Sequence, residues 1–359
     1  MQRISFFANA LHRFGFKTVL LTALFSLFAA APLCFAAEAP TKEKPIVWRM
    51  GGLYARGVSY GKTYQGFADN VKRLSGGRMI IEVVYDGEGV PASEQLSAVR
   101  SGLLEMSNPF QALHAGEFPA GVVELGLPDG PSNLLELRAM FREGEWLETM
   151  RKAYASIGVY YLTEAGCASG TYLLTKKPIK SVADLKELKI RCPGAYGMKL
   201  ANLGASPVTM ALSEVYSSLA SGLLDGVDGC TMLDHYEAKT FEMAKYFYPQ
   251  PVSNAQILGL ICNLEAWNKL PDDLKAIMQA AGELYANDWA NKSVVWEREA
   301  YLKMKAAGLQ DGPAPSDADV KTWQAAGRKV WVDYAAKDSF CKQLLDLQTK
   351  FMKQLGYSF

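Results

Sequence analysis

Short apolar runs alternate with amphipathic segments along most of this 359-residue chain. Residues 46–50 and 79–85 have the pattern of buried strands, and the second run is rich in β-branched side chains. Between them, the apolar side chains of 60–74 fall on one helical face, and a Gly-Gly pair follows. A third strand is expected at 103–106. This order predicts an α/β fold with mostly parallel sheets covered on both faces.

The stretch 181–229 continues the alternation, and the rest of the chain is organised around it. Its first strand, 188–191, is stopped by Cys192-Pro193-Gly194, because proline lacks the backbone donor that a strand needs. Arg191 is therefore expected at the carboxyl end of a strand, where open α/β sheets bind their ligands. A guanidinium there suits a carboxylate ligand. The alternative is a surface arginine paired with a neighbouring acid.

Three motifs in this stretch resemble the solute-binding proteins of TRAP transporters, the DctP family. They are K-K-P-I-x-S-x-A-D-L-K-x-L-K-I-R at 176–191, L-G-A-S-P-V-x-M at 203–210 and S-E-V-Y-x-x-L-x-x-G-x-x-D-G at 213–226. The resemblance implies a periplasmic receptor that binds a small organic acid anion and docks on the membrane permease of an ion-driven importer. It also implies that Arg191 binds the carboxylate of the substrate.

The resemblance further implies the two-lobe periplasmic binding protein fold, with a hinge and a long C-terminal helix that spans both lobes. An aromatic-proline segment at 245–251 is interpreted as part of the hinge. We expect lobe I to comprise 37–162 plus 250–285, lobe II to comprise 163–249 plus 286–359, and the spanning helix to cover about 271–308.

The first 36 residues have the pattern of a secretory signal peptide. Basic residues and no acids precede an apolar run at 18–31, and Cys34-Phe35-Ala36 offers a cleavage site. We predict cleavage after Ala36 and a periplasmic mature protein. A membrane anchor is the alternative, but the run is short for a span. Lipidation of Cys34 is disfavoured because Leu33 is bulky.

Polar residues follow the third predicted strand, so Ser107 and Asn108 are candidates for ligand contact. A plain turn is the alternative for both. Phe110 is predicted to line the ligand, with a core position as the alternative. Beyond them, 119–128 has an irregular pattern and 133–155 has the pattern of one long helix.

The remaining site candidates come from the resemblance. Glu164 is a candidate for ligand contact, and the family commonly carries a second arginine soon after it. This chain has no arginine there, and Tyr172 is a candidate to supply a hydroxyl, with a core position as the alternative. Asp228 keeps an acid that the family has, whereas Gly229 is expected to remove a contact and open space. Asn254 falls where a 2-oxo-acid-binding branch contacts ligand or ion, and a solvated asparagine at the start of a strand is the alternative. We therefore expect a monocarboxylate, such as an oxo or hydroxy acid, with an apolar or aromatic portion.

Charge and cysteine content exclude several classes of function. Removal of residues 1–36 leaves a formal net charge of about −2, so nucleic acid is not an expected partner. The five remaining cysteines lack metal-ligand spacing and are expected to be mostly buried and unpaired. We predict no cofactor and no metal site.

An enzyme is the main alternative class, and the sequence offers it little support. His114 and His235 lie in no hydrolase or metal motif. A binding module that feeds a sensor kinase would have the same sequence features as a transport receptor, so that alternative stays open. We predict that the protein is not an enzyme and that it is a monomer or a homodimer.

Overall fold

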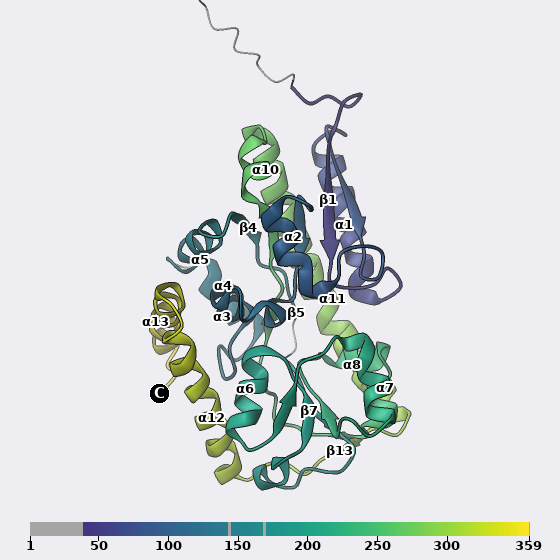
Figure 1. Ribbon diagram of the computed structural model, residues 1–359, viewed down its shortest axis with the longest axis vertical. Helices are drawn as coiled ribbons and strands as arrows, with labels where there is room; N and C mark the ends of the chain where they lie inside the picture. The colour runs from purple at the N-terminus through teal and green to yellow at the C-terminus, as the bar shows by residue number, and fades with distance from the viewer. Residues whose placement is uncertain (1–38, 143–144, 168–169, 359) are drawn as a thin grey trace, which may run out of the picture. The chain divides into compact units, whose positions relative to one another are not determined.

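The computed structural model describes residues 39–142, 145–167 and 170–358. The predicted signal peptide lies outside these residues. Within the described part, the chain forms two larger mixed sheets and one small two-stranded sheet (Figure 1). No helix in that part has the length and apolar character that crossing a membrane requires.

The first sheet with its helices is here called lobe I. Its first three strands in the chain are parallel, as predicted, whereas the strand at 260–263 runs antiparallel to both of its neighbours. The strand order is β2 (Met79–Val84), β1 (Ile46–Gly52), β3 (Met106–Asn108), β12 (Leu260–Asn263) and β4 (Val159–Thr163).

Helices of lobe I pack on this sheet through their apolar faces. In α1 (Ser59–Leu74), the side chains of Tyr64, Phe67 and Val71 are fully buried, which confirms the predicted face except at its last residue, Leu74, which is exposed. The other helices of lobe I are η1 (Ala92–Glu94), α2 (Gln95–Ser101), η2 (Gln111–His114), α3 (Pro119–Leu125), α4 (Leu134–Arg142), α5 (Trp146–Ala155) and α10 (Leu264–Lys269).

The second sheet with its helices is here called lobe II. Its order is β13 (Gln310–Asp311), β10 (Tyr246–Phe247), β6 (Leu174–Thr175), β9 (Gly226–Val227), β7 (Lys189–Arg191) and β8 (Ser206–Val208), and β7 pairs in parallel with β8 and β9. Its helices are η3 (Val182–Leu185), α6 (Gly194–Asn202), η4 (Leu212–Glu214), α7 (Val215–Ala220), α8 (Met232–Glu237) and α9 (Thr240–Met243).

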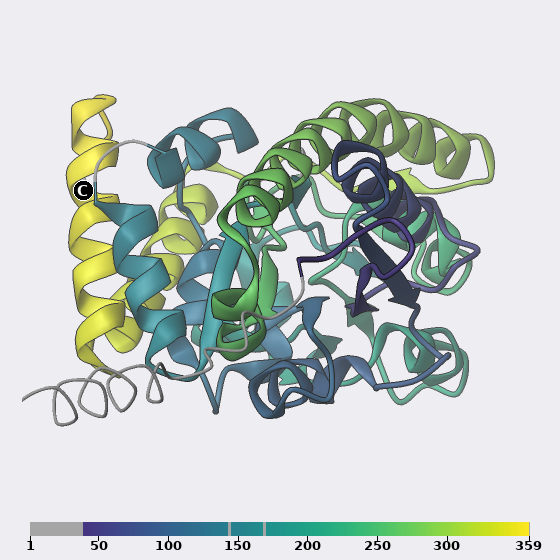
Figure 2. The ribbon, with the colours of Figure 1, turned by 90° about the horizontal axis from the view of Figure 1, so that it is seen from above.

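Three C-terminal helices connect the lobes. The long helix α11 (Asp272–Ala306), predicted from the sequence, packs against α1 of lobe I and α8 of lobe II. Helix α12 (Asp317–Ala335) packs against α6, and α13 (Ser339–Gln354), yellow in Figure 2, packs against α3 and α5. Strands β5 (Gly166–Cys167) and β11 (Gln256–Ile257) pair where the chain passes between the lobes.

Several local predictions differ from the structure. The third strand is Met106–Asn108, so the polar pair belongs to the strand and does not follow it. Residues 119–128 contain α3, because Pro119 occupies the first helical turn, where a missing N–H has no cost. The single helix expected at 133–155 consists of α4 and α5.

Candidate functional site

Arg191 is the last residue of β7, as the proline-glycine stop predicted. Pro193 follows in extended backbone, and α6 begins directly after it. The Arg191 side chain is 3% exposed. A buried guanidinium is costly unless its N–H groups find acceptors, so its hydrogen bonds define what this residue can do.

Backbone carbonyls hold the Arg191 guanidinium in a fixed orientation. Its Nε donates to the carbonyl of Met210 at 3.1 Å, and its Nη1 donates to the carbonyls of Asp228 at 3.1 Å and Gly229 at 3.3 Å. Nη1 also lies 3.4 Å from the Cys230 sulfur. Nη2 has no hydrogen-bond partner among the described residues. The arginine is therefore anchored on two nitrogens, and one edge is left for an anion.

The structure overturns one expectation about Gly229. We expected the missing side chain to open space for a ligand, but an added Cβ would lie 2.8 Å from Pro193 Cδ and 3.2 Å from Arg191 Nη1. Gly229 also has φ +74°, which other residues adopt at a cost. The glycine is thus needed for the turn that presents two carbonyls to Arg191, and the space beside it is already filled.

Asp228 is fully buried next to this arginine. Its Oδ1 accepts a hydrogen bond from the Gly229 N–H. Burial raises the pKa of Asp228 to about 7, although the Gly229 N–H, the Thr171 hydroxyl and the charges of Lys199 and Arg191 lower it. The predicted candidates Arg191, Asp228 and Gly229 are therefore neighbours at the adjacent ends of β7 and β9 in lobe II, and this group is here called the Arg191 turn.

Tyr172 lies close to the same group of charges. Its pKa is raised by burial and by the negative charges of Glu297 and Asp228. The half-buried ring packs against Phe247, with the ring centroids 5.4 Å apart. The Tyr172 carbonyl is 2.9 Å from Nε2 of His235, and burial lowers the pKa of that histidine to about 4. His235 is thus a neutral packing residue that fixes the Tyr172 backbone.

The lobe I candidates Ser107 and Asn108 are fully buried in β3. The Ser107 hydroxyl donates to the Gly51 carbonyl at 3.0 Å. The Asn108 amide donates to the Leu258 carbonyl at 2.5 Å and accepts from the Tyr64 hydroxyl at 3.0 Å. Ser107 therefore joins β3 to β1, and Asn108 joins β3 to α1 and to the segment before β12; a ligand role for them stays a prediction.

The other candidates lie away from the Arg191 turn. Glu164 is 2% exposed, and its Oε1 accepts hydrogen bonds from Arg142 at 2.6 Å and Arg138 at 3.3 Å. Asn254 donates to a loop carbonyl of lobe I at 3.3 Å. Phe110 is 7% exposed and belongs to the large core cluster that reaches into both lobes. None of these three has a hydrogen bond or ion pair with Arg191 in the part that the structure describes.

Lys199 is a residue that the sequence analysis missed. It lies on α6 with a fully buried side chain, and its Nζ donates to both carboxylate oxygens of Asp129, at 2.8 and 3.0 Å. The ammonium also lies 4.7 Å from the centre of the Trp323 ring. Burial lowers the pKa of Lys199 to about 8, in spite of the attraction to Asp129. A lysine on an otherwise apolar helix face was the signal available in the sequence.

Another buried carboxyl, Glu124 on α3, hydrogen-bonds inside lobe I. It accepts hydrogen bonds from the hydroxyls of Tyr154 at 2.6 Å and Tyr161 at 3.1 Å, and from the N–H of Gly259 at 3.0 Å. Burial raises the pKa of Glu124 to about 7, against the effect of these hydrogen bonds.

We expect Glu124 to make stability depend on pH. Its pKa is about 7 in the folded chain and near 4.5 when unfolded, so its contribution is fully present below about pH 4.5 and is lost as the pH rises through 7. The Glu124→Gln variant is neutral at every pH. Its unfolding free energy relative to that of the natural protein should therefore be higher at about pH 8 than at about pH 5. Urea denaturation at both pH values measures this difference. The exposed Glu299→Gln change serves as the control, and a difference for Glu124→Gln that is the same at both pH values would contradict the expectation.

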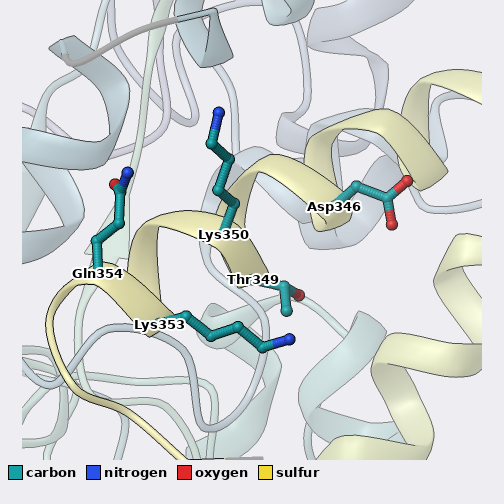
Figure 3. Close-up of a pocket in the computed structure, with 5 residues that line it drawn as sticks. All are labelled: Asp346, Thr349, Lys350, Lys353 and Gln354. Carbon is teal, nitrogen blue, oxygen red and sulfur yellow. The ribbon is translucent and has the colours of Figure 1, made fainter.

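Two surface hollows of the described part are lined by none of the predicted site residues, one on α13 and one beside β1 and α10. One hollow of about 510 Å³ runs along one face of α13 and contains none of the predicted site residues (Figure 3). Its lining comes from a single helix, so it lacks the converging groups of a small-molecule site. In the described ranges, no group of three or more His, Cys, Asp or Glu is placed to hold a metal ion.

Residues 51–338 match the family model described as bacterial extracellular solute-binding protein, family 7. The chain belongs to this family. Over 311 residues it is 27% identical to the monocarboxylate 2-oxoacid-binding periplasmic protein of Nostoc sp., and the alignment covers 86% of this chain and 84% of that protein. Over 294 residues it is 27% identical to the C4-dicarboxylate-binding periplasmic protein DctP of Rhodobacter capsulatus, with 80% and 85% covered.

A solved structure of the same architecture is the TRAP periplasmic solute-binding protein from Colwellia psychrerythraea with bound calcium and pyruvate. It superposes with a TM-score of 0.82 at 24% identity, over 87% of this chain and 95% of that one. The family 7 protein described here therefore has the fold of TRAP periplasmic solute-binding proteins. Both the resemblance and the two-lobe α/β fold predicted from the sequence are confirmed. All three relatives named here are described as periplasmic binding proteins.

Proposed function

We propose that this protein is the periplasmic receptor of a TRAP importer and that Arg191 binds the carboxylate of a small organic acid. The supporting observation is the Arg191 guanidinium itself, which is almost fully buried. Its Nε and Nη1 donate to backbone carbonyls, and its Nη2 has no hydrogen-bond partner among the described residues. A charge-assisted hydrogen bond to a carboxylate would use that edge. The signal peptide predicted at 1–36 would deliver the chain to the periplasm.

The ligand we propose is a monocarboxylate, with a 2-oxo or hydroxy group and an apolar portion. A second arginine is absent from the sequence between Glu164 and Arg191, so a second carboxylate would lack the usual partner there. The Tyr172 and Phe247 rings offer an apolar surface close to the Arg191 turn. The name of the Nostoc relative, which binds monocarboxylate 2-oxo acids, agrees with this class.

Capture would occur by closure of the two lobes over the ligand. Closure removes water from the arginine–carboxylate pair, and this strengthens a charge-assisted hydrogen bond. The lobes already touch in this structure, since an added Cβ at Gly194 of α6 would lie 2.9 Å from the Cβ of Ala112 in η2. The closed receptor would then dock on the membrane permease and release the anion.

A thermal-shift screen of organic acids tests this proposal. Branched or aromatic 2-oxo monocarboxylates, such as 4-methyl-2-oxovalerate, should raise the melting temperature, because a ligand that binds only the folded state stabilises it by mass action. Succinate should have little effect. If only dicarboxylates shift the melt, the proposed ligand class is wrong. Mass spectrometry of acids that co-purify with the protein would identify the natural ligand directly.

A further inference from the structure

Helix α1 of lobe I begins without a cap of its own. Its N-cap residue is Val58, which has no side-chain oxygen to accept a hydrogen bond, and its first turn contains no acid. The first N–H groups of a helix have no partner within the helix, and a negative charge near them is favourable. A carboxylate from elsewhere would satisfy both requirements.

Glu237, the last residue of α8 in lobe II, supplies this carboxylate. The Ser59 N–H donates to its Oε1 at 2.9 Å and to its Oε2 at 3.3 Å, and the Ser59 hydroxyl donates to Oε1 at 2.6 Å. Ser59 is the first residue of α1. The two residues are 178 positions apart in the chain, so this cap joins the lobes.

The next residue of α1, Tyr60, also hydrogen-bonds to a glutamate carboxylate outside lobe I. The Tyr60 hydroxyl donates to Oε1 of Glu297 on α11, and Oε2 of the same carboxylate accepts from the Leu233 N–H in the first turn of α8. Glu297 is 6% exposed and Tyr60 is fully buried. Helix α8 is therefore tied to α1 at both of its ends, once directly and once through α11.

We propose that Glu237 is a cross-lobe cap that stabilises the closed arrangement without touching the ligand. This inference rests on the proposed function only in assuming that capture requires closure. A contact that favours the closed state in the absence of ligand raises the fraction of molecules in the closed state. The apparent affinity for ligand rises in proportion to that fraction. Loss of Glu237 should thus weaken every ligand by the same factor.

The expected factor follows from the cost of losing a helix cap. Removal of an N-cap acceptor typically lowers the equilibrium constant for forming the capped state by about 3- to 30-fold. We expect Glu237→Ala to weaken binding of both 4-methyl-2-oxovalerate and pyruvate within this range, mainly through faster dissociation. Glu237→Gln keeps one acceptor and loses the charge, so its effect should be smaller.

Calorimetric titration with these two acids is the first measurement. Hydrogen exchange of the ligand-free protein is the second, and it should show faster exchange at the start of α1 in Glu237→Ala than in the natural protein. Glu299→Gln, an exposed change on α11, is the matched control and should alter neither result. Circular dichroism and the melting temperature establish that each variant is folded, and Ser59→Ala tests the same contact from the other lobe.

Two results would overturn the inference. One is unchanged exchange at the start of α1 in the folded, ligand-free Glu237→Ala protein. The other is a loss of affinity confined to one of the two acids, since Glu237 would then act on the ligand itself. If neither acid binds the natural protein, the proposed ligand class fails, and the exchange measurement alone decides whether the cap forms.

Discussion

Arg191→Ala is expected to weaken carboxylate binding by about 2–4 kcal/mol, or roughly 30- to 1,000-fold. The variant removes the charge and the free Nη2 edge that we assign to the ligand. It also leaves the carbonyls of Met210, Asp228 and Gly229 without their donor, so some stability will be lost as well. Calorimetric titration measures the affinity, and a denaturation curve measures the stability of the same preparation.

The Arg191→Lys variant separates charge from geometry. Lysine keeps the positive charge but has a single donor head, so it cannot contact both the backbone carbonyls and a carboxylate as a guanidinium does. We expect it to be better folded than Arg191→Ala and still much weaker than the natural protein in binding. Unchanged affinity in the alanine variant would show that the ligand binds elsewhere.

Lys199→Met is expected to destabilise the folded protein by about 3–5 kcal/mol. The change leaves Asp129 with its carboxylate largely buried and without the ammonium that neutralises it. Removing one partner of a buried ion pair is costly because the remaining charge was already taken out of water. Urea or guanidinium denaturation gives the difference in unfolding free energy.

Two comparisons make this second prediction specific. Lys269→Met breaks a pair with Glu265 on α10 in which the lysine side chain is 73% exposed, and it should cost less than about 0.5 kcal/mol. The double variant Lys199→Met with Asp129→Asn should be more stable than Lys199→Met alone, because the unpaired charge is gone. Equal costs at Lys199 and Lys269 would contradict the role assigned to the buried pair.

Sequence patterns predicted the elements whose apolar periodicity is uninterrupted. Strands β1 and β2, the face of α1 and the long helix α11 are confirmed for this reason. Ser107 and Asn108 were expected after the third strand because polar residues usually mark a strand end, whereas here they belong to β3 and bond to Gly51 of β1 and to the segment before β12. A pattern of residue types does not show which polar groups find partners in tertiary structure.

The position of Arg191 in the candidate site was predictable from the sequence, whereas its hydrogen-bond partners were not. A strand stopped by proline and glycine placed Arg191 at a sheet edge. Its acceptors are backbone carbonyls of Met210, Asp228 and Gly229, which have no signature in the sequence. The partner of Lys199 is 70 residues away, and only the packing of α6 against lobe I brings the two together.

The anchoring of Arg191 has a consequence for how receptors of this kind diversify. Its oxygen acceptors belong to the main chain, and every residue type supplies a carbonyl. Point substitutions at Met210, and at other side chains around the anion, can therefore reshape the surrounding space while the positive charge stays in place. Gly229 is the exception, since a side chain there would collide with Pro193. Selection for a new substrate would be expected to change the walls of the site and to leave this turn alone.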